Sequence, residues 1–142
     1  MDEKNVVLQT VEMISQLMGR LESQAFDLEG FSDITMNQMH YLETIGELDS
    51  PTFGDLAEGL GVTPPSVSGI VKKLIRTGYL NKEQSQDDGR VYYLHLTDKG
   101  IRFNQLHGEV HQVLARRITE NLNPDEIKIL AVLLAKITEP DE

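Results

Sequence analysis

The segment from Thr63 to Gly78, TPPSVSGIVKKLIRTG, constrains the fold of this chain more than any other stretch. It predicts a helix, because the Thr63 hydroxyl can accept from first-turn N–H groups, and Pro64 and Pro65 are tolerated where no N–H is needed. Gly78 is expected to end the helix. Apolar residues recur at three- and four-residue spacing and form one stripe that faces a core: Val67, Ile70, Val71 and Leu74.

The opposite side of this helix is polar, with small residues first and cations later: Ser66, Ser68, Gly69, Lys72, Lys73 and Arg76. Short hydroxyls can reach base edges and long cations can reach phosphates, so the pattern is typical of a helix that enters a DNA major groove. A surface helix with an ordinary solvated face has a similar pattern. The neighbouring segments decide between the two interpretations.

The segment before this helix favours the DNA-binding interpretation. Residues 49–51 predict a turn, and Thr52 with Asp55 three residues later starts a short helix, FGDLAEGL, that ends at Gly61. This short helix, the tight connection after it and the helix that begins at Thr63 together predict a helix-turn-helix.

The segment after Gly78 changes its hydrophobic period to two. This change predicts short strands over residues 79–83 and 91–96, joined by the polar hairpin tip SQDDGR. A helix-turn-helix followed directly by a hairpin with a basic tip predicts a winged helix. Arg90 lies at that tip and is interpreted as a DNA contact, whereas the alternative is a solvated hairpin cation.

Two helices are predicted before the helix-turn-helix. The first covers residues 5 to about 24, and residues 26–34 are predicted to form a bend. The second runs from Thr35 to about Glu47, because Thr35 and Gln38 match the capping-box pattern.

Two more helices are predicted after the hairpin. Thr97 caps a long one that reaches about Leu122, and the sequence NPDE at residues 123–126 caps the last. The first and last helices carry more apolar surface than a lone terminal helix can bury on its own domain, which favours a dimer. The main stripe of the last helix consists of Ile127, Leu130, Leu134 and Ile137.

The charge of the chain is unevenly distributed. The net charge is −10, yet residues 72–102 carry seven cations and four acids, a local charge of +3. A phosphate-binding surface needs a local positive potential rather than a positive total. The chain has 142 residues and no cysteine, no apolar run near the roughly 20 residues that cross a bilayer, and no signal peptide at MDEKN. We therefore expect a cytoplasmic protein of one domain, without disulfides.

Many spaced residues of the reading region form a recognisable pattern: Leu56-Ala57, Leu60-Gly61-Val62, Ser66-Val67, Val71-Lys72-Lys73-Leu74, Gly78-Tyr79-Leu80, and Asp88-Gly89-Arg90 through Leu96-Thr97-Asp98-Lys99-Gly100. With this pattern the chain resembles the MarR family of transcriptional regulators over nearly its full length. The resemblance implies a mainly α fold with a small β-hairpin wing, in one domain over residues 1–142. The winged helix-turn-helix would cover about 35–100, and dimerisation helices about 5–30 and 101–138.

The resemblance also implies a function. It implies a homodimeric repressor, not an enzyme, that binds a palindromic operator in double-stranded DNA, with one reading helix of each subunit in a major groove. The wing arginine, here Arg90, is expected in the minor groove, and Asp88 is expected to hold the hairpin tip. The candidate DNA-binding residues are Thr63, Ser66, Ser68, Lys72, Lys73, Arg76, Asp88 and Arg90.

Histidines raise the question of a metal. His107 and His111 are four residues apart on the long helix and hence on one face, a spacing that can chelate a metal, and His40 lies on the second predicted helix. Histidine pairs on exposed helices are also common without any metal. His95, on a predicted wing strand, is expected to be simply exposed.

The zinc-uptake repressors of the MarR family sharpen the metal hypothesis. The resemblance to them implies zinc ligands at Glu22, His40, His107 and His111, whereas the positions that match their second site are Leu28, Met39 and Leu106, none of them ligands. Three imidazoles and one carboxylate complete a tetrahedral zinc shell, which favours a regulatory site over hydrolysis. Zinc would then act as a corepressor, and nickel, cobalt and manganese stay open.

Three rival interpretations stay open at this point. A repressor of the same family could be released by a small aromatic or lipophilic ligand, bound near Phe26, Phe31, Met36 and Tyr41. A metal hydrolase is disfavoured, because the Glu of a His-Glu-x-x-His motif is absent after His107. A winged helix that binds proteins instead of DNA is disfavoured by the positive charge of residues 72–102.

Overall fold

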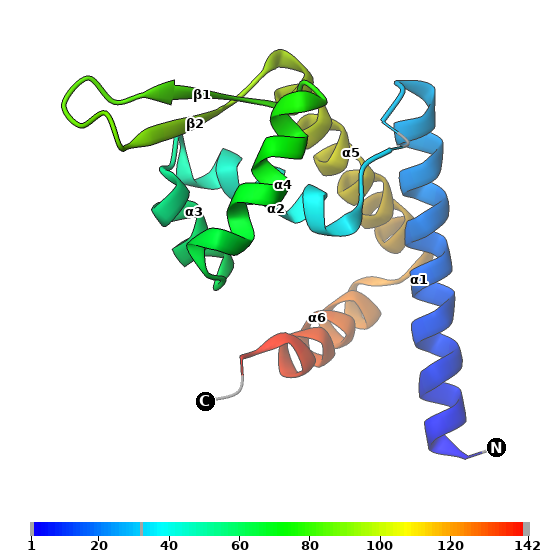
Figure 1. Cartoon of the computed structure of the whole chain (residues 1–142). Helices are drawn as coiled ribbons and strands as arrows, with labels where there is room; N and C mark the ends of the chain where they lie inside the picture. The colour runs from blue at the N-terminus through cyan, green and yellow to red at the C-terminus, as the bar shows by residue number, and fades with distance from the viewer. Residues whose placement is uncertain (1, 32, 141–142) are drawn as a thin grey trace. The chain divides into compact units, whose positions relative to one another are not determined.

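A computed structural model describes residues 2–31 and 33–140 (Figure 1). Its elements follow in the order α1 (Glu3–Leu28), α2 (Met36–Leu48), α3 (Phe53–Leu60), α4 (Pro64–Arg76), β1 (Leu80–Gln84), β2 (Tyr92–Leu96), α5 (Asp98–Asn121) and α6 (Pro124–Thr138). The predicted fold class, mainly α with a small β-hairpin, is confirmed. No helix within these described residues has both the length and the apolar content needed to cross a membrane.

Helix starts follow the predicted caps closely. The Thr35 hydroxyl accepts from the Gln38 N–H at 3.2 Å, and the Gln38 side chain accepts from the Thr35 N–H at 3.1 Å. The same reciprocal box opens α3 and α6. At α5 the Thr97 hydroxyl accepts from the Gly100 N–H at 3.2 Å. These caps form because each satisfies N–H groups that have no partner inside the helix.

Several predicted boundaries are wrong. α1 continues to Leu28 instead of bending at residue 26, because Phe26 is buried against Phe103, with ring centroids 4.9 Å apart. The predicted bend also includes residue 32, which lies outside the described residues. The strands start one residue later than predicted, since Tyr79 completes the end of α4 by donating its N–H to the Leu74 carbonyl at 2.9 Å.

The described residues divide into two compact units. We call residues 23–107 the winged unit, and the described part of residues 1–22 and 108–142 the helical unit. α1 and α5 each contribute to both units, whereas α2, α3, α4, β1 and β2 lie wholly in the winged unit and α6 lies in the helical unit.

The winged unit is built around a closely packed core. Its centre is an aromatic cluster of Phe26, Phe31, Tyr79 and Phe103, in which the Phe103 ring contacts the other three with centroids 4.9–6.1 Å apart. The predicted stripe of α4 faces this core: Val67, Val71 and Leu74 are fully buried and Ile70 is half-buried. Other fully buried side chains come from α2, α3 and the hairpin: Leu42, Ile45, Leu56, Leu80 and Leu94.

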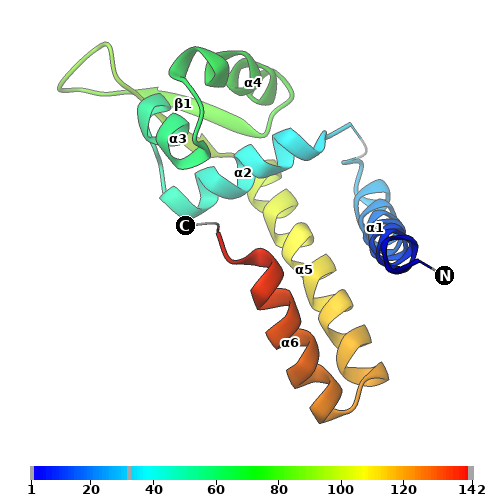
Figure 2. The same ribbon diagram turned by 90° about the horizontal axis from the view of Figure 1, so that it is seen from below.

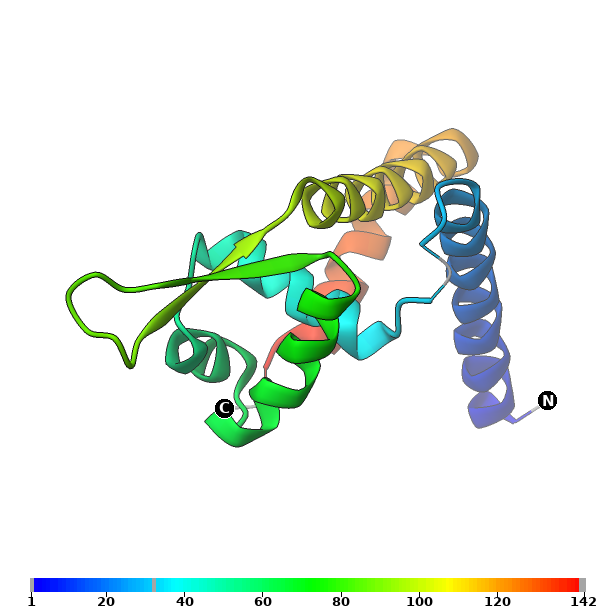
Figure 3. The ribbon, with the colours of Figure 1, turned by 45° about the horizontal axis from the view of Figure 1, so that its top comes forward.

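The hairpin is tied at its base to the turn between α2 and α3. β1 and β2 pair antiparallel, with Leu80 opposite Leu96 and Glu83 opposite Tyr93. The Leu94 N–H donates to the Pro51 carbonyl at 2.8 Å, and an isolated bridge joins Thr52 to Tyr93. From this base the hairpin extends beyond α3 (Figure 3).

The helical unit leaves most of its large apolar side chains exposed. Val110 is buried, and α6 follows α5 after a short connection at residues 122–123 (Figure 2). The exposed large apolar residues of this unit are Val6, Val7, Leu8, Val11, Met13, Ile14, Val113, Ile129, Val132, Leu133, Leu134 and Ile137. An apolar surface of this extent is typical of a protein–protein interface.

Candidate nucleic-acid interface

The polar side of α4 is accessible, as predicted from the spacing. Ser66, Gly69, Lys72, Lys73 and Arg76 are exposed, and Ser68 is half-buried. Lys73 and Arg76 lie in the last turn of the helix, where their charge is favourable against the carbonyl end of the helix dipole. Hydroxyls therefore occupy the start of the accessible side and cations occupy its end.

The start of α4 differs from the predicted cap. Thr63 takes the N-cap position, yet its hydroxyl makes no bond to the helix backbone. Instead it lies 2.9 Å from the Ser66 hydroxyl, and the Ser66 N–H donates to the Thr63 carbonyl at 3.0 Å. Pro64 and Pro65 have no N–H, so the Ser66 N–H is the first that a cap could bind, and the Thr63 carbonyl accepts it in place of the hydroxyl. The result is a hydroxyl pair at the helix start.

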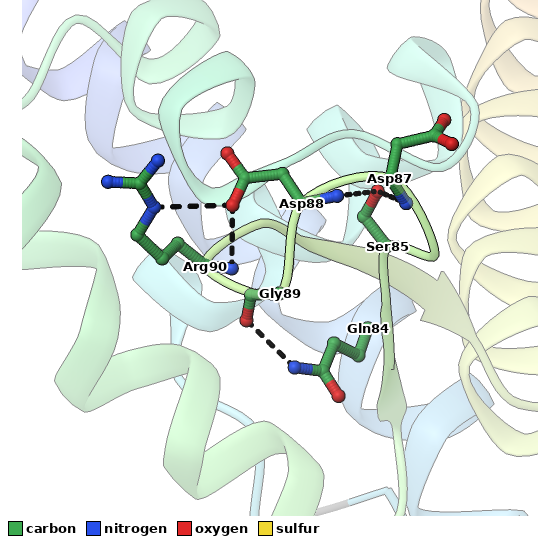
Figure 4. A network of polar contacts seen from close by, with 6 residues as sticks. All are labelled: Gln84, Ser85, Asp87, Asp88, Gly89 and Arg90. Atoms are coloured by element: carbon green, nitrogen blue, oxygen red, sulfur yellow. Dashed lines mark hydrogen bonds and ion pairs between the residues drawn. The ribbon is translucent and has the colours of Figure 1, made fainter.

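The wing tip holds its polar groups in a defined network (Figure 4). The Ser85 hydroxyl accepts from the N–H groups of Asp87 and Asp88, at 3.3 and 3.4 Å. The Gln84 side-chain amide donates to the Gly89 carbonyl at 2.8 Å, and the Ser85 N–H donates to the Val91 carbonyl at 2.8 Å. The tip is thus closed by side chains as well as by its backbone.

Arg90 projects from this network and is oriented by Asp88. One Asp88 carboxylate oxygen accepts from the Arg90 N–H at 3.0 Å and from the Arg90 Nε at 3.2 Å (Figure 4). The Arg90 side chain is 92% exposed. An ion pair this exposed contributes at most about 1 kcal/mol to stability. Its effect is to orient the guanidinium, which keeps its outer N–H groups directed to solvent.

Other cations of the region serve the fold. The Lys82 Nζ lies 4.8 Å from the centre of the Tyr92 ring. The Lys99 Nζ donates to the Thr77 carbonyl at 3.0 Å and lies 4.4 Å from the centre of the Tyr79 ring. Both lysines are exposed and keep their charge beside these contacts, so they add to the positive surface formed by Lys72, Lys73, Arg76 and Arg90.

Two ionisable contacts support the frame of the winged unit. Arg102 binds Glu29 through two hydrogen bonds, and this bonding holds the pKa of the Glu29 carboxyl below its ordinary value. Burial, followed by the nearby charge of Asp33, raises the pKa of Tyr79 to about 12. The Tyr79 hydroxyl donates to Asp33 at 3.4 Å. Tyr79 is therefore a neutral core residue that carries Lys99 on its ring.

The four predicted metal ligands are divided between the two units. His40 and His107 lie in the winged unit, and Glu22 and His111 lie in the helical unit. Among residues 2–31 and 33–140, no three His, Cys, Asp or Glu side chains are grouped so that they could hold a metal ion. The ligand set stays a prediction.

His107 has a partner that the sequence did not indicate. Its Nε2 lies 2.5 Å from a carboxylate oxygen of Glu43 on α2, and its ring stacks on Phe26 with centroids 6.3 Å apart. The His107 side chain is mostly buried. Glu43 follows His40 by three residues, so both lie on one side of α2. This helical spacing could have indicated Glu43 as a partner of His107.

His95 corrects the prediction that it is simply exposed. Its Nδ1 lies 3.0 Å from the Ser50 hydroxyl, and its Nε2 lies 3.0 Å from a carboxylate oxygen of Glu83. The Ser50 contact was not visible in the sequence, since it joins the turn after α2 to β2.

The residues proposed to line an organic-ligand site have mixed positions. Phe26, Phe31 and Tyr41 are buried in the core of the winged unit. Met36 is exposed at the start of α2. Burial also raises the pKa of Tyr41 above its ordinary value.

Comparisons with known proteins agree with this geometry. Residues 34–92, which cover α2 to the start of β2, match the MarR family. The chain is 31% identical, over 61% of its length, to YhjH, an uncharacterized HTH-type transcriptional regulator of Bacillus subtilis (strain 168). It spans about half the length of the first curated relatives it matches. It is also 27% identical, over 93% of its own length and 87% of the relative, to the transcriptional regulator AdcR of Streptococcus pneumoniae.

One solved structure has a similar fold. FabT of Streptococcus pneumoniae, solved in complex with DNA, matches with a TM-score of 0.76 and 27% identity, over 96% of this chain and 94% of that one. The chain is thus similar to MarR family proteins over residues 34–92 and to HTH-type transcriptional regulators, and it shares its fold with FabT.

Proposed function

We propose that this chain, taken as a MarR family winged-helix protein, is a sequence-specific DNA-binding repressor that acts as a homodimer. The observation that carries the proposal is the pairing, within one compact unit, of the accessible polar side of α4 with an exposed, oriented Arg90 at the wing tip. Exposed cations beside small hydroxyls on a single helix match the requirements of phosphate contact and base reading. The DNA complex of the structurally similar FabT supports the same use of the fold.

In this proposal each residue has a defined task. α4 enters the major groove, where the Thr63–Ser66 hydroxyl pair and Ser68 meet base edges. The three cations of α4 neutralise phosphates and so make binding salt-dependent. Arg90 enters the adjacent minor groove, and Asp88 fixes its direction. The residues assigned to phosphates are Lys72, Lys73 and Arg76.

The dimer is proposed from the helical unit alone. Its large apolar side chains on α1 and α6 are exposed in a single chain, and a second copy presents the same surface. A two-fold pair of subunits would place two reading helices on the two half-sites of a palindrome.

Single charge reversals test the DNA proposal. The probe is a duplex selected by the wild-type protein from a random library, and affinity is measured by fluorescence anisotropy at several salt concentrations. Lys73→Glu and Arg90→Glu are each expected to weaken binding by at least about tenfold, and Lys73→Glu should lower the salt slope by about one. Lys4→Glu makes the same charge change at the start of α1 and should leave affinity within about twofold. Unchanged affinity in both reading-region variants would refute the proposal.

We further propose that zinc is the regulatory ligand, held by Glu22, His40, His107 and His111. The support is the chemistry of the donor set, which suits a closed tetrahedral shell, together with the resemblance of these four positions to the zinc-uptake repressors of the MarR family. In the structure the Nε2 of His107 contacts Glu43, so that metal binding at this atom has to replace the contact. Ligands drawn from α1, α2 and α5 would let metal favour one spacing of the two reading helices, which would make zinc a corepressor.

Isothermal titration of the metal-stripped protein with zinc tests this step. We expect saturable binding that weakens by at least about tenfold in His107→Ala and in His111→Ala, since even the loss of a residue behind a ligand weakens metal sites by that factor. His95→Ala serves as the matched control and should titrate like the wild type. Identical titrations for the wild type and all three variants would refute the proposed zinc site.

The alternative regulator is a small aromatic or lipophilic molecule. Release of the DNA probe by a phenolic acid, without any effect of a chelator, would favour this alternative over zinc. The aromatic side chains of the winged unit are what such a ligand would contact, and to bind there it would have to open their packing against one another.

A further inference from the structure

His95 connects three segments of the winged unit through one imidazole ring. It lies on β2, and its ring nitrogens contact Ser50, 45 residues away in the turn after α2, and Glu83, 12 residues away on β1. A carboxylate can only accept hydrogen bonds, so the Nε2 of His95 carries the proton that is donated to Glu83. The Nδ1 is then able to accept from the Ser50 hydroxyl. Both ring nitrogens are therefore engaged, one by the turn after α2 and one by β1.

The turn held by His95 has an unusual backbone. Asp49 and Ser50 have φ values of 53° and 58°, in the left-handed region that residues other than glycine seldom adopt. Surrounding contacts have to hold such a conformation in place. The Ser50–His95 bond does so from the side chain, and the Leu94 N–H to Pro51 carbonyl bond does so from the backbone.

Side-chain packing fixes this junction only in part. A hollow of about 210 Å³ lies beside it, lined by Ile45, Asp49, Ser50, His95, Leu96 and Ile101. Apolar contacts do not fill this space, so on this side of the junction the Ser50–His95 bond adds to the Leu94–Pro51 bond and the Thr52–Tyr93 bridge that hold β2 against the turn. A two-stranded hairpin is marginally stable by itself, so its direction depends on how its base is held.

From these observations we propose that His95 is a positioning residue for the wing, which sets the direction in which the hairpin presents Arg90. The inference rests on the proposed DNA-binding function of Arg90. The route from base to tip is continuous. His95 binds Glu83, and the adjacent Gln84 binds the Gly89 carbonyl next to Arg90. Loss of the base contacts increases the freedom of the hairpin, and this freedom has to be removed again on binding DNA.

A double-mutant cycle tests the proposal with the duplex selected by the wild-type protein. Arg90→Ala is expected to weaken binding about tenfold, within the range for a well-oriented arginine contact. His95→Ala is expected to weaken binding about threefold in the wild-type background, and by less than about 1.5-fold when Arg90 is already alanine, because residues that act through one another are not additive. A residue that merely supports folding would give the same factor in both backgrounds.

Conservative and control variants narrow the interpretation. Glu83→Gln keeps an acceptor for the His95 Nε2 and should bind more tightly than Glu83→Ala. The affinity of Glu83→Ala should lie between those of the wild type and His95→Ala, because the Ser50 contact remains. Asn81→Ala changes the residue directly opposite His95 in the ladder and should leave affinity unchanged. If His95→Ala proves unstable in thermal unfolding, Ser50→Ala removes a single hydroxyl and the cycle is repeated with it.

The outcomes separate this inference from the proposed function. Unchanged affinity in Arg90→Ala would refute the DNA contact itself. A loss in Arg90→Ala combined with no effect of His95→Ala, or with the same factor in both backgrounds, would refute the positioning role alone. The N–H groups of Ser85 and Val91 close the hairpin tip. Faster exchange of these two amide hydrogens in His95→Ala would support the positioning role.

Discussion

The winged unit and the helical unit use their apolar residues in opposite ways. In the winged unit, side chains from segments far apart in the chain meet in one core, as Phe26 of α1 and Phe103 of α5 do. In the helical unit, apolar side chains such as Ile14 and Leu134 are spaced for burial, yet they are exposed in the single chain. The first unit therefore has a core of its own that can stabilise it, whereas the second exposes apolar residues of the kind that a partner chain covers.

This contrast separates stability from assembly. A change in the winged core should act on the folding of one chain, and it should do so at any protein concentration. A change in the helical unit should act on association, and its effect should depend on concentration. Three tests, ordered from the largest expected effect, can break or sharpen this distinction.

Truncation of Phe103 is expected to have the largest effect. Its ring is fully buried in the aromatic cluster, so Phe103→Ala should lower the free energy of unfolding by about 3–5 kcal/mol through the cavity it leaves. Urea denaturation followed by circular dichroism measures the change. Ile14→Ala in the helical unit is the matched control and should cost below about 1 kcal/mol at concentrations too low for a dimer. Equal losses in the two variants would erase the contrast between the units.

A charge on the stripe of α6 should break assembly. Leu134→Glu places a carboxylate on the proposed dimer surface, where burying it would cost several kcal/mol, so the dimer should dissociate at least about tenfold more readily. Sedimentation equilibrium measures this shift. Leu28→Glu, at an exposed position of the winged unit, makes the same change and should leave the mass unaffected. A monomeric wild type would show that the exposed stripe has another purpose.

Substitutions at two glycines on α5 should change stability least, and they compare the two units within one helix. A Cβ on Gly100 would lie 2.3 Å from the Tyr79 carbonyl oxygen, so Gly100→Ala should destabilise the winged unit by about 1–3 kcal/mol. A Cβ on Gly108, in the helical unit, meets no atom within 4 Å, so Gly108→Ala should stabilise the helix by about 0.5–1 kcal/mol. Thermal unfolding of both variants gives the signs. A loss at Gly108 would indicate that a second chain approaches α5 closely there.

The parts of the fold that the sequence predicted are those with local causes. The capping boxes at Thr35, Thr52 and Asn123 join residues three apart, and the α4 stripe repeats at the helical period, so both are legible in the chain itself. Local reasoning failed where a long-range contact decided the outcome. Phe26 extends α1 because its partner Phe103 lies on another helix.

The candidate site divides along the same line. The Asp88–Arg90 contact spans two residues, and the polar side of α4 follows from helix geometry, so the sequence indicated both. The partners of His95 and His107 were missed because Ser50 and Glu43 approach them only after folding. For the same reason the sequence did not indicate that Lys99 contacts the Thr77 carbonyl and the Tyr79 ring.

The two consecutive imino acids at the head of α4 have a consequence for any anion that meets that end of the helix. Most helix N-termini can bind a phosphate through several free backbone N–H groups. Here Pro64 and Pro65 provide none, and the amide of Ser66 is already bound to Thr63. The side chains available at this end are two rotatable hydroxyls, each of which can donate or accept a hydrogen bond and can turn toward whichever atom the ligand presents.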